Sequence, residues 1–319
     1  MEKEQRKKQR RRRLLAGGGL LLILGAGIFA GWQSDKEEQK EAITAAAPET
    51  KTEEVTATPE PVSALESLQT RMEERVAKES GTWSIYIKDL NTEEEISINP
   101  EQMYAASLIK LFVMESSYEN RELLEENSRK TAQNKRNPEN VEELLRNMIE
   151  TSDNEAYNEL VRLHSESADF SEGCRKIGEY LAETGYENTG IFHTLSPSET
   201  KEESIADEDT KNYTCAEDCG KLLEEIYRGT CVSEEASEEM LDFLLHQETT
   251  EKIPQGVPNG ISVANKTGET EEVQHDAAIV FGEKTDYIIC IMSCGWKEEG
   301  RAIETIRDLS GITYATLET

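Results

Sequence analysis

The chain has 319 residues and a formal net charge of −30, with 31% charged and 36% hydrophobic residues. Residues 1–13 carry eight Lys or Arg and two Glu, a net charge of +6, so the remaining 306 residues carry −36. A body this acidic repels phosphate, which excludes a general nucleic-acid-binding protein. The length allows one domain of about 250 residues, large enough to bury a full core.

The N-terminal segments predict a membrane anchor. Residues 1–13 form a basic tip, and residues 14–32 are 19 positions without a charge, close to the ~20 residues that a membrane-spanning helix needs. Because Arg10 to Arg13 precede the apolar run, we expect a cytoplasmic N-terminus and a single-pass protein whose bulk lies outside the cytoplasm. A cleaved signal peptide is the alternative, and it places the bulk of the protein on the same side.

Two segments follow this anchor. Residues 33–62 contain Glu, Lys, Thr, Ala and Pro and almost no large apolar residue, so they predict a disordered linker. Residues 63–319 form the predicted domain, which contains all six cysteines. Export permits disulfides, with 15 possible connectivities, whereas buried free thiols are the simpler alternative. The cysteine spacings contain no C-x-x-C pair, so we expect neither a zinc site nor another metal or cofactor.

The hydrophobic periodicity of this domain predicts strands at both ends and helices between them. A helix is expected over 64–79, followed by a hairpin whose strands contain Ile85 and Ile96. Helical spacing dominates from 105 to about 250. Strands return at 261–266, 277–281 and 287–292, before a last helix over 298–310. This order predicts an α+β fold: a five-stranded antiparallel sheet built from both terminal segments, with an all-helical lobe inserted between them.

One short motif pairs a nucleophile with a base. Ser107 and Lys110 form an S-x-x-K sequence in the apolar run Tyr-Ala-Ala-Ser-Leu-Ile-Lys-Leu-Phe-Val-Met. Residues three apart share a helix face, so the lysine amine can reach the serine hydroxyl. A serine needs a base to become a nucleophile, and a lysine in an apolar wall can lose its charge and act as that base.

Two further triplets have the polar groups that such a site needs. Ser152, Asp153 and Asn154 follow a predicted helix, and all three residue types also suit a helix N-cap. Lys266, Thr267 and Gly268 end a predicted strand, where an ordinary turn is the simpler interpretation. All three motifs together, in this order, should arise by chance in fewer than about one chain in a thousand at these residue frequencies.

The three motifs resemble those of the penicillin-recognising serine hydrolases, specifically the class A β-lactamase-like branch. The resemblance covers roughly 64–317 and extends to the Asn-Tyr-Thr segment at Asn212 and the His-Asp-Ala-Ala segment at His275. It implies that Ser107 forms an acyl-enzyme, that Lys110 takes its proton and that Ser152 relays a proton toward the leaving nitrogen.

The resemblance also implies a substrate-binding set. Asn154 would hydrogen-bond the substrate's amide side chain, and Lys266 and Thr267 would hold its carboxylate. Gly268 would let the substrate lie along the strand edge, and the backbone N–H groups of Ser107 and Glu269 would form the oxyanion hole. Two lysines converging on this pocket would make it locally positive within an acidic domain.

The sequence departs from the family pattern at two places. Class A β-lactamases carry E-x-x-L-N, whose Glu activates the water that cleaves the acyl-enzyme, and this chain has no such motif. Glu199 lies near the expected position, in an acidic stretch whose neighbouring residues do not match. Glu269 directly follows Lys-Thr-Gly, where its charge would repel a substrate carboxylate.

Three functions therefore stay open. The chain is expected to open β-lactam rings or related amides as a membrane-bound, monomeric serine hydrolase acting on small β-lactams or cell-wall peptides. A D-Ala-D-Ala carboxypeptidase or transpeptidase with slow deacylation is the second possibility, favoured by the missing Glu motif. A non-catalytic wall-binding module is the third. A Ser-His-Asp triad is not supported, because none of the four histidines lies in a matching motif.

Overall fold

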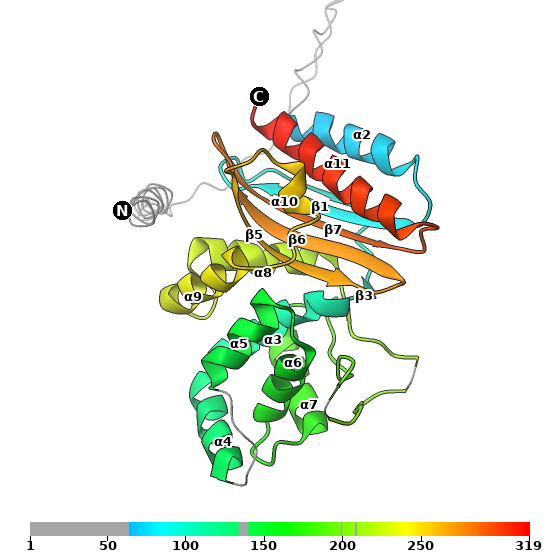
Figure 1. The fold of residues 1–319 in the computed structure, drawn as a ribbon. Coiled ribbons are helices and arrows are strands. Elements are labelled where there is room, and N and C mark those ends of the chain that lie inside the picture. Colours follow the sequence, from blue (N-terminus) through cyan, green and yellow to red (C-terminus); the bar gives the residue numbers. More distant parts are fainter. Residues whose placement is uncertain (1–63, 134–139, 199, 208) are drawn as a thin grey trace, which may run out of the picture. The chain divides into compact units, whose positions relative to one another are not determined.

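A five-stranded antiparallel sheet organises the protein, as the sequence predicts (Figure 1). The computed structural model describes residues 64–133, 140–198, 200–207 and 209–319. The strand order β2-β1-β7-β6-β5 pairs the N-terminal hairpin with the C-terminal strands through β1 and β7, and leaves β5 at one edge. The strands are β1 Thr82–Asp89, β2 Glu95–Ile98, β5 Ser262–Glu269, β6 Val273–Phe281 and β7 Asp286–Cys294.

Three helices cover one face of this sheet (Figure 1), namely α2 Ala64–Val76, α10 Ile253–Gly256 and α11 Glu299–Leu317. Their apolar side chains bury alternate residues of β1, such as Ile85 and Ile87, against Leu68 and Ile306. The last helix continues seven residues beyond the predicted end at Ser310. Ser310 is buried and donates a 2.9 Å hydrogen bond to a carbonyl, so this polar residue belongs to the packed face.

The inserted lobe is helical, and α3 is its central element. Ten of the eleven α3 residues are buried, so this helix has no solvent-exposed face and is surrounded by the lobe. A two-stranded sheet joins β3 Met103–Tyr104 to β4 Tyr213–Thr214. The helices are η1 Ala106–Leu108, α3 Ile109–Glu119, α4 Arg121–Gln133, α5 Val141–Glu150, α6 Asn154–Leu163, α7 Phe170–Thr184, α8 Ala216–Arg228 and α9 Glu234–Leu245.

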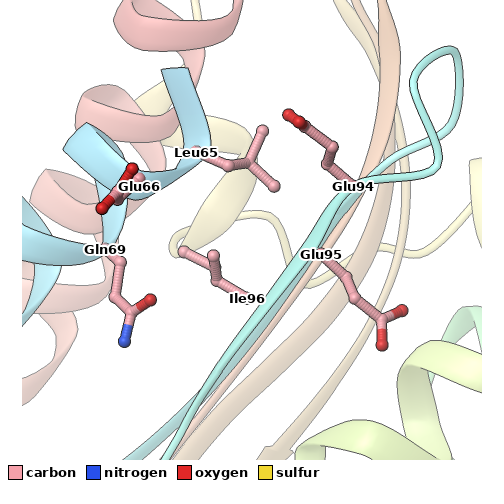
Figure 2. A pocket seen from close by; sticks show the side chains of 6 residues that line it. All are labelled: Leu65, Glu66, Gln69, Glu94, Glu95 and Ile96. Atoms are coloured by element: carbon pink, nitrogen blue, oxygen red, sulfur yellow. The ribbon is translucent and has the colours of Figure 1, made fainter. Parts of the chain in front are cut away.

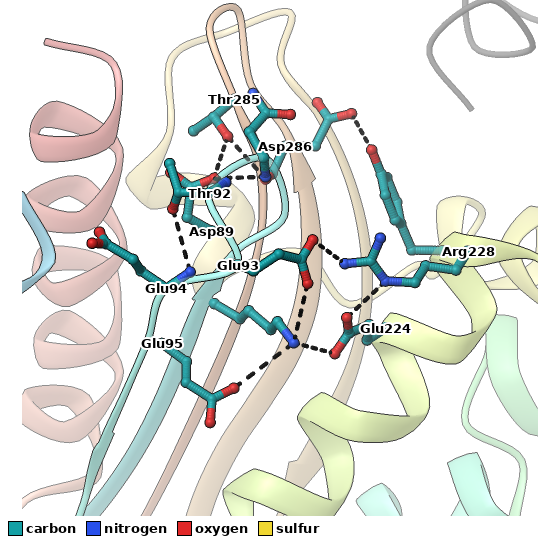
Figure 3. Close-up of polar contacts among 12 residues, drawn as sticks. Asp89, Thr92, Glu93, Glu94, Glu95, Glu224, Arg228, Thr285 and Asp286 are labelled. Carbon is teal, nitrogen blue, oxygen red and sulfur yellow. Dashed lines mark hydrogen bonds and ion pairs between the residues drawn. The ribbon is translucent and has the colours of Figure 1, made fainter. Parts of the chain in front are cut away.

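An ion-pair network fixes α8 against the β1–β2 hairpin (Figure 3). Lys88 donates a 2.8 Å bond to Glu224, and Arg228 donates 2.7 Å and 2.5 Å bonds to Glu224 and Glu93. Lys88, Glu224 and Arg228 are partly buried and Glu93 is exposed. Because the four charges share partners, the network holds more firmly than isolated surface pairs. It therefore fixes the position of the lobe's α8 on the sheet.

The N-terminal predictions concern residues that the structure does not describe. The basic tip 1–13, the anchor 14–32 and the linker 33–62 all lie outside the described residues. Within the described part of the chain, none of the helices has the length and apolarity required to span a membrane. The six cysteines are all described, and each carries a free thiol in agreement with the simpler of the two expectations.

Candidate active site

Ser107 lies in the short turn that leads into the central helix. Its neighbour Ala106 has a φ of 45°, a left-handed conformation that costs a non-glycine residue about 1–2 kcal/mol. The turn is held by two 2.9–3.1 Å bonds, from the Ala105 N–H to the Asn212 carbonyl and from the Leu108 N–H to the Ala105 carbonyl. The strained backbone is thus fixed on both sides, and Ser107 is held at the N-terminal end of a buried helix.

Lys110 lies one turn further along and points at this serine. Its Nζ is 3.1 Å from the Ser107 Oγ, 2.7 Å from the Asn154 Oδ1, 2.6 Å from the Ser152 carbonyl and 3.2 Å from the Ser152 Oγ. The residue is completely buried. Burial is the main cause that lowers the pKa of Lys110 well below its usual range, and the nearby charge of Lys266 lowers it further.

The contacts of Lys110 suit a neutral amine that acts as a base. A neutral amine has two N–H donors and one lone pair. The carbonyl oxygens of Ser152 and Asn154 accept only, and they are the two shortest contacts, so they take both donors. The lone pair is left to accept the hydroxyl proton of Ser107 or Ser152. Lys110 is therefore arranged to remove the proton of Ser107.

Ser152 joins two lysines. Its Oγ lies 2.9 Å from the Lys266 Nζ and 3.2 Å from the Lys110 Nζ. Its φ of 58° is again left-handed, which aims the carbonyl of the same residue at Lys110 as well. The arrangement connects the base near Ser107 to a second amine through one hydroxyl, which is a path for a proton.

In the triplet Ser152-Asp153-Asn154, only the middle residue is a helix cap. The Asp153 side chain caps α6 and accepts a 2.6 Å bond from the Ala156 N–H. Ser152 precedes the helix, and Asn154 is its first residue. With the Asn154 Oδ1 bound to Lys110, the Nδ2 group is the part of this amide left to meet a substrate.

Lys266, Thr267 and Gly268 lie inside β5, not at its end as predicted, because β5 continues to Glu269. Burial lowers the pKa of Lys266 to about 7, although the Asp276 carboxylate opposes this effect. A Cβ at Gly268 would lie 2.9 Å from the Ala105 carbonyl oxygen, closer than packing allows. Glycine thus permits the edge strand to approach the Ser107 turn.

A third lysine, which belongs to none of the three motifs, lies beside this strand. Lys252 donates a 2.6 Å bond to the Glu269 Oε2 and a 3.2 Å bond to the His275 carbonyl. His275 accepts from the Ser293 N–H at its Nδ1, so its Nε2–H donates to the Tyr104 carbonyl. These contacts hold the His275 ring between β7 and β3, which is a structural role.

The position of Glu199, the weak candidate for activating water, lies outside the described residues. The residues on both sides of it bind Glu155, through the Ser198 N–H at 2.6 Å and the Thr200 Oγ1 at 3.0 Å. Earlier in the same loop, Leu195 is buried, and its N–H and carbonyl both bind the Asn158 side chain. Within the described chain, Lys110 forms hydrogen bonds with Ser107, Ser152 and Asn154, none of which is a carboxylate that could activate water.

Two acids and a thiol gather elsewhere in the lobe, where the sequence predicts no ligand cluster. Ligand atoms of Glu115, Glu225 and Cys231 lie within 4.8 Å of one another. Burial raises the pKa of Glu115 to about 7, and Tyr180 donates a 3.0 Å bond to its Oε1. The raised pKa favours the protonated form of the Glu115 carboxyl group, which reduces its repulsion from the nearby Glu225.

The cavity drawn in Figure 2 is unrelated to the three motifs. It has a volume of about 350 Å³ and lies between α2 and β2, where Leu65 and Ile96 face each other. The remaining lining residues are polar or acidic: Glu66, Gln69, Glu94 and Glu95. None of these six residues belongs to the motifs, so the chemistry of the chain lies at the other edge of the sheet, along β5.

Comparison with known proteins assigns the domain as a whole to a family. The model of the β-lactamase enzyme family matches residues 67–317, and the chain belongs to this family. A search of curated proteins found no match.

Solved structures share the fold at low sequence identity. PBP-A is 22% identical with a TM-score of 0.65, over 80% of this chain and 97% of that chain. The TLA-1 extended-spectrum β-lactamase is 16% identical with a TM-score of 0.67, over 81% of this chain and all of that one. A PBP-A variant solved as an acyl-enzyme complex with penicillin G is 22% identical with a TM-score of 0.66, over 81% and 98%. The predicted fold class is therefore confirmed.

Proposed function

We propose that the protein is a serine acyl-transfer enzyme that opens β-lactams or related cell-wall amides through an acyl-enzyme on Ser107. The observation that carries this proposal is the buried Lys110 amine, 3.1 Å from the Ser107 Oγ, with its two N–H groups directed to carbonyl oxygens. Membership of the β-lactamase family supports the reaction class.

The reaction would proceed in two stages. The Ser107 Oγ attacks the substrate carbonyl while Lys110 takes the hydroxyl proton, and the backbone N–H groups of Ser107 and Glu269 stabilise the oxyanion. The proton passes through Ser152 to the leaving nitrogen as the C–N bond breaks. Lys266 orients the Ser152 hydroxyl by its 2.9 Å contact. Water then hydrolyses the Ser107 ester and releases the acid.

We propose further that water hydrolyses the β-lactam acyl-enzyme slowly, so that β-lactams remain bound to Ser107, and that the protein turns over as a D-Ala-D-Ala-type peptidase. The chain lacks E-x-x-L-N. The carboxylate of Glu155, in the first turn of α6, is bound by Ser198 and Thr200 of the loop. The apolar run 14–32 and the basic residues before it support a membrane anchor with the enzyme domain outside the cytoplasm.

Labelled penicillin tests the nucleophile. The wild-type domain should carry one covalent label, mapped to Ser107 by peptide mass spectrometry, and Ser107→Ala should carry none. Ser198→Ala is the matched control, because Ser198 and Lys201 form the chain's other S-x-x-K sequence. No labelling and no turnover of any β-lactam or D-Ala-D-Ala peptide would favour the non-catalytic alternative.

The lifetime of the label separates the two enzymatic functions. After removal of free penicillin, slow deacylation predicts a label that persists for minutes to hours. Release within seconds would instead establish an efficient β-lactamase and would contradict our interpretation of the loop.

A further inference from the structure

The strand that carries Lys266 ends in an internal ion pair. The Lys252 Nζ lies 2.6 Å from the Glu269 Oε2. The Lys252 side chain is 1% exposed, whereas that of Glu269 is 48% exposed. A buried cation thus has its carboxylate partner supplied by the protein, and the outer part of that carboxylate faces solvent beside the catalytic strand.

This ion pair lies where a substrate carboxylate is expected. Thr267 and Glu269 are two residues apart in β5, so their side chains project from the same face. Lys252 also donates to the carbonyl of His275, and His275 pairs with Gly268. A carboxylate held by the Thr267 hydroxyl would therefore be a close neighbour of Glu269.

Glu269 would repel a substrate carboxylate held by Thr267. The other charged groups around β5 provide little positive charge to offset this repulsion. Burial lowers the pKa of Lys110 well below its usual range, which disfavours its charged form. With a pKa of about 7, Lys266 is half protonated at neutral pH. Burial raises the pKa of Asp276 to about 6, so its carboxylate is mostly ionised beside Lys266. The pKa of His275 is lowered to about 4 by burial, which leaves the ring neutral.

The hairpin that follows β5 adds further negative charge. Glu271 and Glu272 are both exposed in the turn between β5 and β6. Lys211 lies 3.1 Å from the Glu272 carboxylate and neutralises that one acid. The sequence predicts a positive pocket here, whereas the structure has a near-neutral strand with an acidic end.

We propose that Glu269 is a specificity-determining residue that selects substrates with an uncharged or cationic group beside Thr267 over substrates with a carboxylate there. The proposal rests on the acyl-enzyme function of Ser107. Glu269 therefore slows acylation by D-Ala-D-Ala peptides and penicillins, which carry this carboxylate, relative to cell-wall amides in which a carboxamide or an ester replaces it. Glu269→Gln removes a negative charge about 6 Å from that carboxylate and leaves the charge of Lys252 without its partner. At an effective dielectric constant between those of protein and water, one unit of charge at this distance changes binding by about ten-fold.

The test compares one β-lactam in two forms. Benzylpenicillin carries the carboxylate and its methyl ester does not. The second-order rate constant for acylation of Ser107 is measured for both by intact-mass spectrometry, and their ratio is compared among variants. Glu269→Gln should shift the ratio about ten-fold toward the carboxylate form, whereas Glu269→Asp should keep it near the wild-type value.

Glu271→Gln is the matched control. It removes one exposed acid of the same hairpin and should change the ratio less than two-fold. A Glu269→Gln ratio equal to that of wild type, or a shift of the same size in the Glu271→Gln control, would overturn the proposal. If neither form acylates the wild-type protein, the proposed function of Ser107 fails, and this inference fails with it. If both forms acylate with a ratio that does not depend on Glu269, the inference alone fails.

Discussion

The charge of Lys266 should control the pH dependence of acylation by anionic substrates. Its amine is fully buried, and burial lowers its pKa to about 7. About nine-tenths of the free protein holds the Lys266 proton at pH 6, and about one-tenth at pH 8. Since kcat/KM reports the protonation state of the free enzyme, the rate constant for benzylpenicillin should fall about ten-fold between these pH values.

The assay measures acylation of Ser107 from pH 5.5 to 9 with benzylpenicillin and, in parallel, with its methyl ester. The ester has no carboxylate for Lys266 to bind, so its rate constant should fall much less. Asp276→Asn removes the carboxylate that favours protonated Lys266, so the benzylpenicillin profile should move to lower pH. A flat benzylpenicillin profile across this range, or an equal fall for the ester, would refute the assignment.

Three other variants test the packing of the catalytic strand and of the helical lobe. Gly268→Ala should slow acylation at least 100-fold while the protein stays folded, because the new Cβ would lie 2.9 Å from the Ala105 carbonyl oxygen; a rate within three-fold of wild type contradicts this. Asp153→Ala should lower the free energy of unfolding by about 1 kcal/mol through loss of the α6 cap, measured by urea denaturation. Glu115 has a folded pKa of about 7, above its usual value of 4.5, so its contribution to stability declines by about 3 kcal/mol as pH rises through this interval. The free energy of unfolding of Glu115→Gln should therefore rise relative to that of wild type between pH 4.5 and 8. If urea denaturation gives the same difference between the two proteins at every pH, Glu115 does not have this raised pKa.

The sequence was most informative where function needs local spacing. Ser107 and Lys110 lie three residues apart on a helix, so their contact follows from helix geometry. The strands were found from alternation, and their antiparallel order followed from their placement at the two ends of the chain. The family's motifs then located Ser152 and Lys266, which are 114 residues apart and meet at 2.9 Å.

Features set by tertiary packing could not be read from the sequence. Lys252 lies in no motif, and only the fold brings it to Glu269. The left-handed backbone at Ser152 has no residue signal, because serine rarely adopts a positive φ. The two predicted lysines do converge, but burial lowers the pKa of both, to about 7 for Lys266, and so disfavours their charged forms. The prediction of a positive pocket counted both lysines as fully charged, and it did not include the effect of burial on their pKa values.

The contact between Lys266 and Ser152 has a mechanical consequence. Lys266 belongs to the sheet, and Lys110 belongs to the central helix of the lobe. Ser107 lies in the short turn that leads into this helix, and Ser152 lies between two lobe helices. The proton path thus exists only while the lobe and the sheet are docked. A small separation of these two layers would abolish acylation before either layer loses its own secondary structure. Reaction with a labelled β-lactam therefore reports whether the lobe and the sheet are docked. In a denaturant titration, this reaction should be lost at a lower denaturant concentration than the circular dichroism signal of the helices.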